Sequence, residues 1–162
     1  MTTSTSCPSP ARTSAGSSVA EPNLDRLRAL AGELRGALAE LSEFATMPVE
    51  SFTQERRAVN SAKYLLIVAT EAALDICNHL VSRRGPRSPA DYADCIGILG
   101  EMGAIDSDLR ARLVKMARFR NLIVHLYWKV DDREVHRVIR EDLTDLDRYL
   151  RAVGVYLGSD LR

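Results

Sequence analysis

The chain has 162 residues, of which 46% are hydrophobic and only 6% aromatic, and its 22 basic residues balance 22 acidic ones. A chain of this length can bury the core of one domain. The zero net charge excludes the overall positive field of a protein that coats nucleic acid, so any contact with RNA or DNA has to be local.

The N-terminal segment 1–22 is rich in Ser, Thr and Pro and poor in large apolar residues, which predicts a disordered arm. It has no apolar stretch typical of a secretory signal, and no later run approaches membrane-spanning length. We therefore expect a cytoplasmic protein without membrane contact, in which residues 23–162 form one helical domain. The number and spacing of the cysteines also indicate a reducing cytoplasm, because they match neither a disulfide framework nor a zinc site.

Helical spacing of apolar residues predicts five helices along the rest of the chain. They are expected at about 23–44, 51–84, 88–102, from 107 through the segment 116–128, and 131–157. Asn23 can cap the first helix, Ser51 the second and Ser107 the fourth. Strand-like alternation, internal repeats and a glycine-rich phosphate loop are absent from the sequence. The predicted fold is therefore all-α, an up-and-down bundle of about five helices.

The segment 116–128 is a helix-length apolar run that Arg120, Asn121 and His125 interrupt. Charged and polar groups rarely lie in an apolar environment without partners. No acidic residue occurs between Leu109 and Val130, so a carboxylate partner must come from another helix or another chain. Two interpretations are open: a functional site, or a structural role in which Arg120 pairs with that carboxylate and His125 caps the helix.

Residues 116–131 resemble the signature of the HepT-type toxins of the HEPN superfamily. The Arg-x4-His-x-Tyr hallmark of that family is met by Arg120, His125 and Tyr127. The stretch 71–80 and the start of the third predicted helix also resemble the family, and the likeness covers roughly residues 54–157. The resemblance implies a HEPN-like bundle that forms a two-fold dimer, with two copies of the motif facing each other.

The resemblance further implies a metal-independent endoribonuclease that cleaves tRNA or mRNA and needs no cofactor. It would be the toxin of a type II or type VII-like toxin–antitoxin pair, silenced by a cognate MntA-like nucleotidyltransferase antitoxin. RNA carries its own nucleophile, the 2′-hydroxyl, so the protein must supply a proton shuttle and a charge clamp. His125 can exchange the proton, Arg120 can stabilise the phosphate charge, and Asn121 can orient either the imidazole or the phosphate.

Two further groups are expected to assist this site. Arg118 lies three residues before Asn121 on the same side of the helix and adds positive charge. Asp75, on the second predicted helix, is the expected carboxylate partner of Arg120 or His125. Tyr127 is either a half-buried aromatic residue whose hydroxyl reaches water or, by the resemblance, the residue that the antitoxin modifies with AMP.

The other polar clusters receive structural interpretations. Glu71, Asp75 and His79 have a spacing that could hold a metal, but one helix cannot supply a full ligand set, so no metal site is predicted. His136 is expected at the surface. Cys77 and Cys95 are expected to be small core residues.

Two functions of other classes compete with the nuclease. The chain could be a non-catalytic helical partner that binds a nucleotidyltransferase, or a regulatory dimer that binds nucleotides without cleaving RNA. The fold alone does not decide among them. The set of Arg120, Asn121, His125 and Tyr127 favours the nuclease, because a scaffold does not require it.

Overall fold

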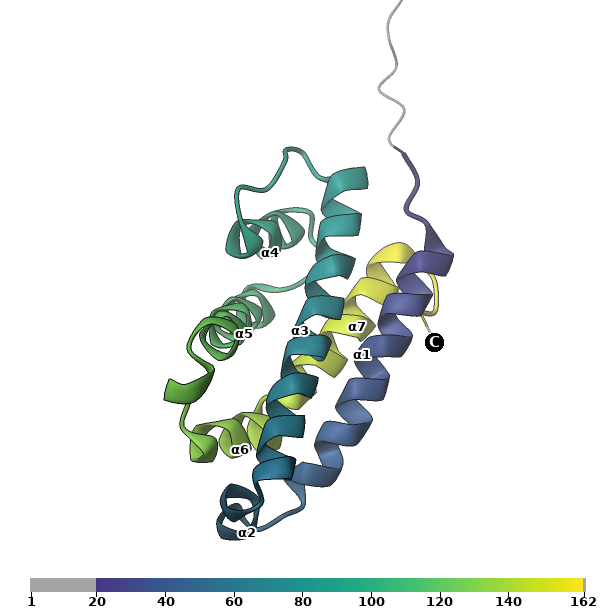
Figure 1. Cartoon of the computed structure of the whole chain (residues 1–162). Coiled ribbons are helices and arrows are strands. Elements are labelled where there is room, and N and C mark those ends of the chain that lie inside the picture. The colour runs from purple at the N-terminus through teal and green to yellow at the C-terminus, as the bar shows by residue number, and fades with distance from the viewer. Residues whose placement is uncertain (1–19, 162) are drawn as a thin grey trace, which may run out of the picture.

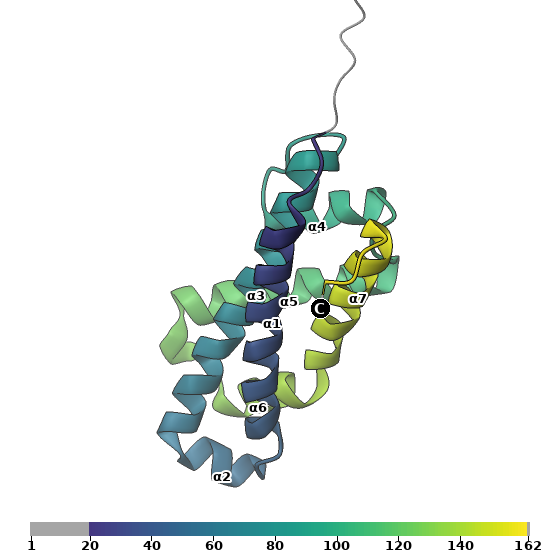
Figure 2. The same cartoon turned by 90° about the vertical axis from the view of Figure 1, so that its right-hand side faces the viewer.

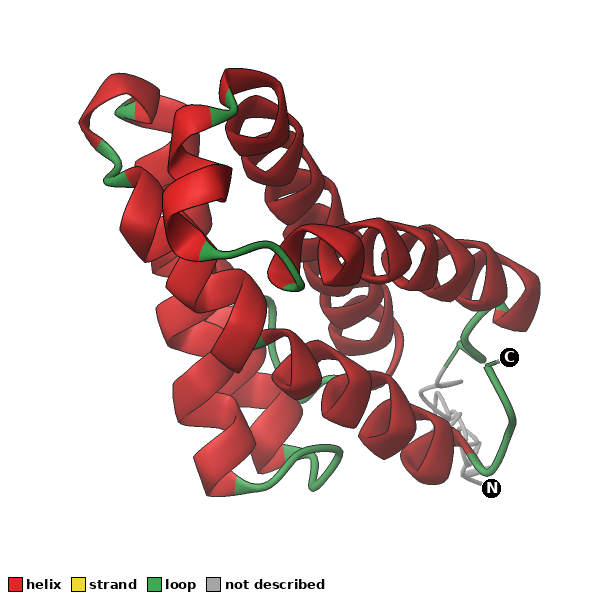
Figure 3. Ribbon diagram, turned by 90° about the horizontal axis from the view of Figure 1, so that it is seen from below, coloured by secondary structure: helices red, strands yellow, loops and turns green. Residues whose placement is uncertain are grey.

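The computed structural model describes residues 20–161, which contain seven α-helices, one short 3-10 helix and no strand. The elements are α1 (Leu24–Ala45), α2 (Val49–Gln54), α3 (Arg56–Arg84), α4 (Tyr92–Glu101), α5 (Ser107–His125), η1 (Tyr127–Lys129), α6 (Asp132–Glu141) and α7 (Leu143–Leu157). The all-α prediction is confirmed, and short loops join the helices (Figure 3). The predicted arm lies outside the described residues, apart from its last three.

The long helices α1 and α3 run side by side (Figure 1), and α7 contacts α1, α5 and α6. α3 is the central helix, because it contacts α1, α2, α4, α5 and α6 and buries about half of its residues. Its length and hydropathy alone would allow it to cross a membrane, but 61% of that apolar window is buried inside the bundle. Many of the apolar residues of α3 therefore belong to the core of the bundle.

Three predicted helices differ from the observed ones, and side-chain caps mark the new starts of the first two. The predicted second helix is divided after Gln54, because the Glu55 side chain accepts from the backbone N–H of Arg57 and starts α3 there. The third begins at Tyr92, where the Asp91 carboxylate accepts from Asp94 N–H at 2.8 Å. The predicted fifth helix is divided at Asp142, so α6 and α7 point in different directions (Figure 2).

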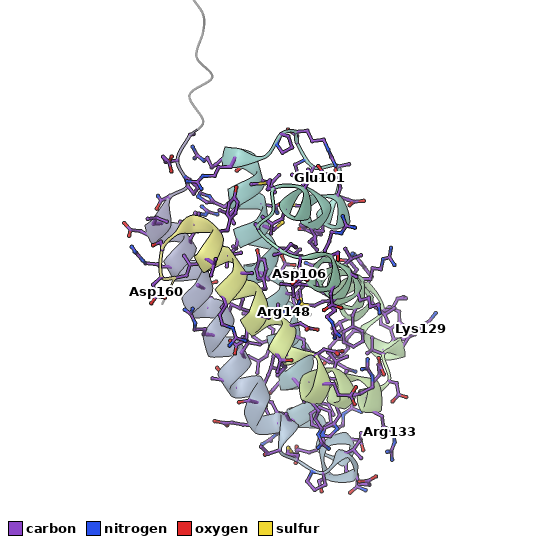
Figure 4. All side chains as sticks on the ribbon, turned by 180° about the vertical axis from the view of Figure 1, so that it is seen from behind. Glu101, Asp106, Lys129, Arg133, Arg148 and Asp160 are labelled. Carbon is purple, nitrogen blue, oxygen red and sulfur yellow. The ribbon has the colours of Figure 1, made fainter. Side chains whose placement is uncertain are left out.

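Polar side chains tie α7 to its neighbours at two levels. Tyr149 is buried, and its hydroxyl donates to the carbonyl of Ala73 in α3 at 3.0 Å. Burial raises the pKa of Tyr149 well above its usual range. At the surface, Arg148 lies beside Asp106 at the start of α5 (Figure 4), 2.6 Å between nitrogen and oxygen, and also pairs with Asp108. These contacts fix the start of α5 against α7.

The buried residues include one that sequence analysis placed at the surface. His136 is buried, with its Nε2 atom 2.8 Å from the carbonyl oxygen of Met47 and its ring against Phe52. The surface prediction for His136 is wrong, because α6 is short and presses its inward face onto α2. Cys77 and Cys95 are buried with their sulfur atoms 2.9 Å apart, which confirms their interpretation as core residues.

Candidate active site

The motif lies in the last turns of α5 and in the turn that follows. The Asp106 side chain caps α5 by accepting from Leu109 N–H at 2.8 Å, so the helix starts one residue earlier than the predicted Ser107 cap implies. The helix ends at His125, because Leu126 leaves the helical conformation with φ −131° and ψ 39°. Tyr127 therefore belongs to the 3-10 turn η1 rather than to the helix. α5 itself lies across α3 (Figure 2).

Arg120 contacts a carboxylate from α3, as the absence of acidic residues in its own segment predicts. Its Nη2 atom forms an ion pair with Glu71, and its Nη1 atom donates to Asn121 Oδ1 at 2.9 Å. The Arg120 side chain is only 17% exposed. The carboxylate is Glu71 rather than the predicted Asp75, which is exposed, because Arg120 meets α3 one helical turn before Asp75.

The α3 residues with possible metal-ligand spacing do not gather around a common point. Glu71 is engaged by Arg120, and His79 Nε2 accepts from the backbone N–H of Asn23, the residue before α1, at 2.9 Å. Burial and the nearby Arg83 lower the pKa of His79. Within residues 20–161, no three His, Cys, Asp or Glu side chains are arranged to hold a metal ion.

His125 and Arg118 lie on the exposed side of α5. His125 is five residues after Arg120, which separates the two side chains by roughly 140° around a helix. Arg120 consequently turns towards α3, whereas His125 turns outward. Among the described residues, no hydrogen bond or ion pair joins His125 to Arg120. One chain therefore joins Arg120 to Asn121 and places His125 one turn after Asn121 on the exposed side of α5, but it leaves His125 and Arg120 on different faces of the helix.

Tyr127 is held against α3 by two side chains. Its hydroxyl donates to Asn60 Oδ1 at 2.7 Å, and the Lys63 ammonium lies 4.8 Å from the centre of its ring. Lys63 is only 5% exposed and lies 2.8 Å from a carboxylate oxygen of Asp132. It also donates to the carbonyls of Tyr127 and Val130, at 3.5 and 3.4 Å.

Asn60 and Lys63 were not among the residues predicted for the site. The signal for Lys63 was present, because a lysine interrupts the apolar stripe of α3 between Ala62 and Leu66. A buried lysine needs a partner, and the sequence alone did not point to the turn after α5 as that partner. Asn60 carries no comparable signal, since an exposed asparagine on a helix is ordinary.

Apolar side chains remain uncovered around the motif. Leu122 and Val124 on α5 are each 41% exposed, Trp128 on η1 is 76% exposed, and Tyr64 on α3 is 66% exposed. Leu122 and Val124 are two residues apart and so lie on different sides of α5, and exposed apolar residues that form a patch mark interaction sites in soluble proteins. In the single chain, the end of α5 is covered on the side that carries Arg120 and Ile123.

Arg120 also lines a cleft of about 480 Å³ between α5, α6 and α7, with α3 at its base. Its floor is apolar and includes Leu66, Met116, Phe119, Ile123, Val138 and Leu146. Two arginines at its rim are already neutralised, Arg112 by Asp108 and Asp145, and Arg137 by Glu134 and its neighbours. The cleft could therefore hold an apolar group, but it has no strong positive field that would attract a phosphate.

The amino-acid sequence is similar to those of named ribonucleases. A protein of Archaeoglobus fulgidus, provisionally named an RNase, is 32% identical over 117 residues, which cover 72% of this chain and 82% of that protein. A tRNA nuclease HepT of Aphanizomenon flos-aquae is 25% identical over 121 residues, which cover 74% of this chain and 82% of the relative.

The fold is similar to that of a solved toxin. The structure of a tri-AMPylated Shewanella oneidensis HEPN toxin in complex with an MNT antitoxin superposes with a TM-score of 0.75, at 21% identity, over 81% of this chain and 98% of the toxin. The family model described as "Ribonuclease HepT-like" matches residues 34–153, which include every helix from the middle of α1 to α7 and the whole motif. The chain therefore belongs to the HepT-like ribonuclease family.

Proposed function

We propose that this chain is a metal-independent endoribonuclease that cleaves RNA through the 2′-hydroxyl, and that it is the toxin of a type II or type VII-like toxin–antitoxin pair. The observation that carries the proposal is the placement of Arg120, Asn121 and His125 in the last two turns of α5, beside an uncovered apolar surface, in a HepT-like ribonuclease. Two free buried thiols, Cys77 and Cys95, support a cytoplasmic site of action.

The reaction requires proton transfer at two oxygen atoms. The 2′-oxygen attacks the adjacent phosphorus, a new P–O2′ bond forms, and the bond between phosphorus and the 5′-oxygen breaks. One group accepts the proton of the 2′-hydroxyl and another gives a proton to the departing 5′-oxygen. The products are a 2′,3′-cyclic phosphate and a 5′-hydroxyl. DNA lacks the nucleophile and is expected to be inert.

Arg120 is suited to stabilise the charge that develops on the phosphate oxygens. A guanidinium group has five N–H donors, and Glu71 and Asn121 each engage one terminal nitrogen of Arg120. These contacts orient the guanidinium plane and leave donors for a phosphate. Arg118 adds positive charge on the exposed side of α5, where RNA would approach.

A second copy of the chain would complete the site. His125 is exposed and separate from Arg120 in one chain, so the proton-transfer group of one chain has to meet the Arg120 of the other. The exposed Leu122, Val124 and Trp128 offer the apolar contact for an isologous interface. Such a homodimer would place two copies of Arg120 and His125 around one RNA strand, which is the arrangement that we propose.

The proposed partner is an MntA-like nucleotidyltransferase antitoxin, which silences the toxin by transferring AMP to Tyr127. Support comes from the fold similarity to a toxin that is itself tri-AMPylated and bound to an MNT antitoxin. Tyr127 is 38% exposed and lies two residues after His125. A nucleotide at that position would add negative charge and bulk where RNA must bind. The proposed substrates are tRNA or mRNA, and one relative is named a tRNA nuclease.

Subunit mixing tests both the nuclease and its shared site. Arg120→Ala and His125→Ala chains are assayed separately, and then after unfolding and refolding together, on an RNA oligonucleotide and its DNA analogue in EDTA. We expect both single variants to be inactive and the mixture to regain part of the wild-type RNA cleavage. Failure of the mixture to cleave would refute the shared site. Inactive wild-type dimer would refute the nuclease and favour the non-catalytic partner of a nucleotidyltransferase.

A further inference from the structure

Tyr127 is fixed at three points by one helix. Asn60 accepts a hydrogen bond from its hydroxyl, while Lys63 lies over its ring and binds its backbone carbonyl. Asn60 and Lys63 are three residues apart on α3, so they are neighbours on one face of that helix. The exposed side chain of Tyr127 is thus held at its tip, its ring and its backbone, although it lies in a short turn.

Lys63 fixes the turn rather than the hydroxyl. An ammonium group has three N–H donors, and here Asp132, Val130 and the Tyr127 carbonyl supply three acceptors. The last carbonyls of a helix and of the turn after it lack helical partners. The buried Lys63 ammonium binds the carbonyl of Tyr127, the first residue of η1, and the carbonyl of Val130, the residue after η1. These two contacts fix the backbone of the turn and so set the direction of the Tyr127 side chain.

Asn60 fixes the hydroxyl. Its amide oxygen accepts the phenolic O–H, and an amide is too weak a base to remove that proton. The hydrogen bond therefore orients the hydroxyl, so the lone pairs of the Tyr127 oxygen point away from Asn60. Tyr64 lies one turn after Asn60 on α3 and is more exposed than Tyr127, at 66% against 38%. Among the described residues, no side chain forms a hydrogen bond with the Tyr64 hydroxyl.

We infer that Asn60 and Lys63 are positioning residues that present the Tyr127 hydroxyl to the nucleotidyltransferase and make Tyr127, rather than the more exposed Tyr64, the acceptor. This inference rests on the proposed regulation by nucleotide transfer. In that transfer, the Tyr127 oxygen attacks the α-phosphorus of a nucleoside triphosphate bound to the transferase. The P–O bond to tyrosine forms as the bond to the β-phosphate bridge breaks, pyrophosphate leaves, and the phenolic proton passes to a base of the transferase or to water.

The test measures modification at single tyrosines. The full chain is incubated with an MntA-like nucleotidyltransferase and MgATP, and tryptic peptides are quantified by mass spectrometry. Trypsin isolates Tyr127 in the peptide 121–129 and Tyr64 in the peptide 64–83. The variants are Asn60→Ala, Asn60→Asp, Lys63→Met and Tyr127→Phe, and Ser61→Ala is the control because Ser61 is the exposed neighbour of Asn60.

We expect Asn60→Ala to lower kcat for modification of Tyr127 about tenfold, which corresponds to the loss of one hydrogen bond, with KM for the toxin unchanged. Asn60→Asp keeps an oxygen acceptor and should restore the wild-type rate, and Ser61→Ala should not change it. Lys63→Met should also lower the rate of Tyr127 modification. This rate is normalised to the amount of folded protein, which circular dichroism measures. A structural defect would instead raise KM or lower the melting temperature of Asn60→Ala.

Each other outcome has a separate meaning. If Asn60→Ala is modified at the wild-type kcat, or if Asn60→Asp is as slow as Asn60→Ala, the positioning role is overturned while modification of Tyr127 stands. If the wild type carries AMP on Tyr64 and none on Tyr127, or none on either, both the positioning role and the proposed regulation are overturned. RNA cleavage by the unmodified wild type is measured separately, so neither result bears on the nuclease itself.

Discussion

Replacing Lys63 by methionine tests whether the buried ammonium holds the end of the motif in place. Methionine keeps the length and apolar character of the lysine stem and removes only the charged group. The change deletes the 2.8 Å contact with Asp132 and the two longer hydrogen bonds to the carbonyls of Tyr127 and Val130. The fold around the stem should survive, because its apolar contacts with α3 neighbours are retained.

The expected cost lies between two limits. Removing one partner of a fully buried ion pair costs about 3–5 kcal/mol, because it leaves a buried charge behind, whereas an exposed pair contributes about 0–1 kcal/mol. Lys63 is almost completely buried, but the Asp132 side chain is 41% exposed and can be rehydrated. We therefore expect Lys63→Met to lower the free energy of unfolding by about 2 kcal/mol, or about 7 °C in melting temperature for a domain of this size.

Urea unfolding followed by circular dichroism at 222 nm measures this loss. Lys129→Met is the matched control, because Lys129 carries the same charge, lies in the same turn and projects outward at the edge of the molecule (Figure 4). Its free energy of unfolding should stay within about 0.5 kcal/mol of the wild-type value. Equal stabilities of Lys63→Met and Lys129→Met, with equal m-values, would refute the role that we assign to Lys63.

Three further predictions concern the core, the acid stability and the uncovered surface. Tyr149→Phe removes the buried hydrogen bond to Ala73 and should lower the free energy of unfolding by about 1 kcal/mol. Burial raises the pKa of Tyr149, so above about pH 10 the folded protein keeps a proton that the unfolded chain has lost. The stability of the wild type should therefore fall with rising pH in that range, and the stability of the variant should fall less. Arg87 holds the pKa of Asp94 at about 2, so wild-type stability should decline as the pH falls from about 4 to about 2, and Asp94→Asn should flatten this decline in urea titrations. Trp128 is the single tryptophan and 76% exposed in one chain, so its emission should shift to shorter wavelength as concentration drives dimer formation; unchanged emission in a dimer shown by light scattering would place the interface elsewhere.

Much of the fold was predictable because its helices carry strong periodic signals. The stripe of α3 and the cap at Asn23 follow directly from local residue pattern, and the structure confirms both. The helix breaks at Glu55 and Asp142 were not predicted, since the apolar period continues through them. Those breaks arise where short helices turn to cover the core, which depends on contacts between residues far apart in the sequence.

The site was predictable to the level of the residue types on α5. The absence of acids near Arg120 correctly indicated a carboxylate from another helix. Asp75 was the expected partner and Glu71 is the observed partner of Arg120, because the pairing depends on the level at which α5 crosses α3, and sequence periodicity does not contain that level. His136 was misplaced for a related reason, since an amphipathic pattern does not reveal that a second short helix covers its polar position.

The most direct measurement of the central claim compares the wild type with His125→Ala on total cellular RNA in EDTA, with chemical analysis of the fragment ends. We expect the wild type to cleave, the fragments to carry 2′,3′-cyclic phosphate and 5′-hydroxyl ends, and His125→Ala to leave the RNA intact. Cleavage that requires a divalent metal, fragments with other ends, or equal cleavage by His125→Ala would contradict the mechanism. A folded, unmodified and dimeric wild type that leaves RNA intact would contradict the nuclease itself.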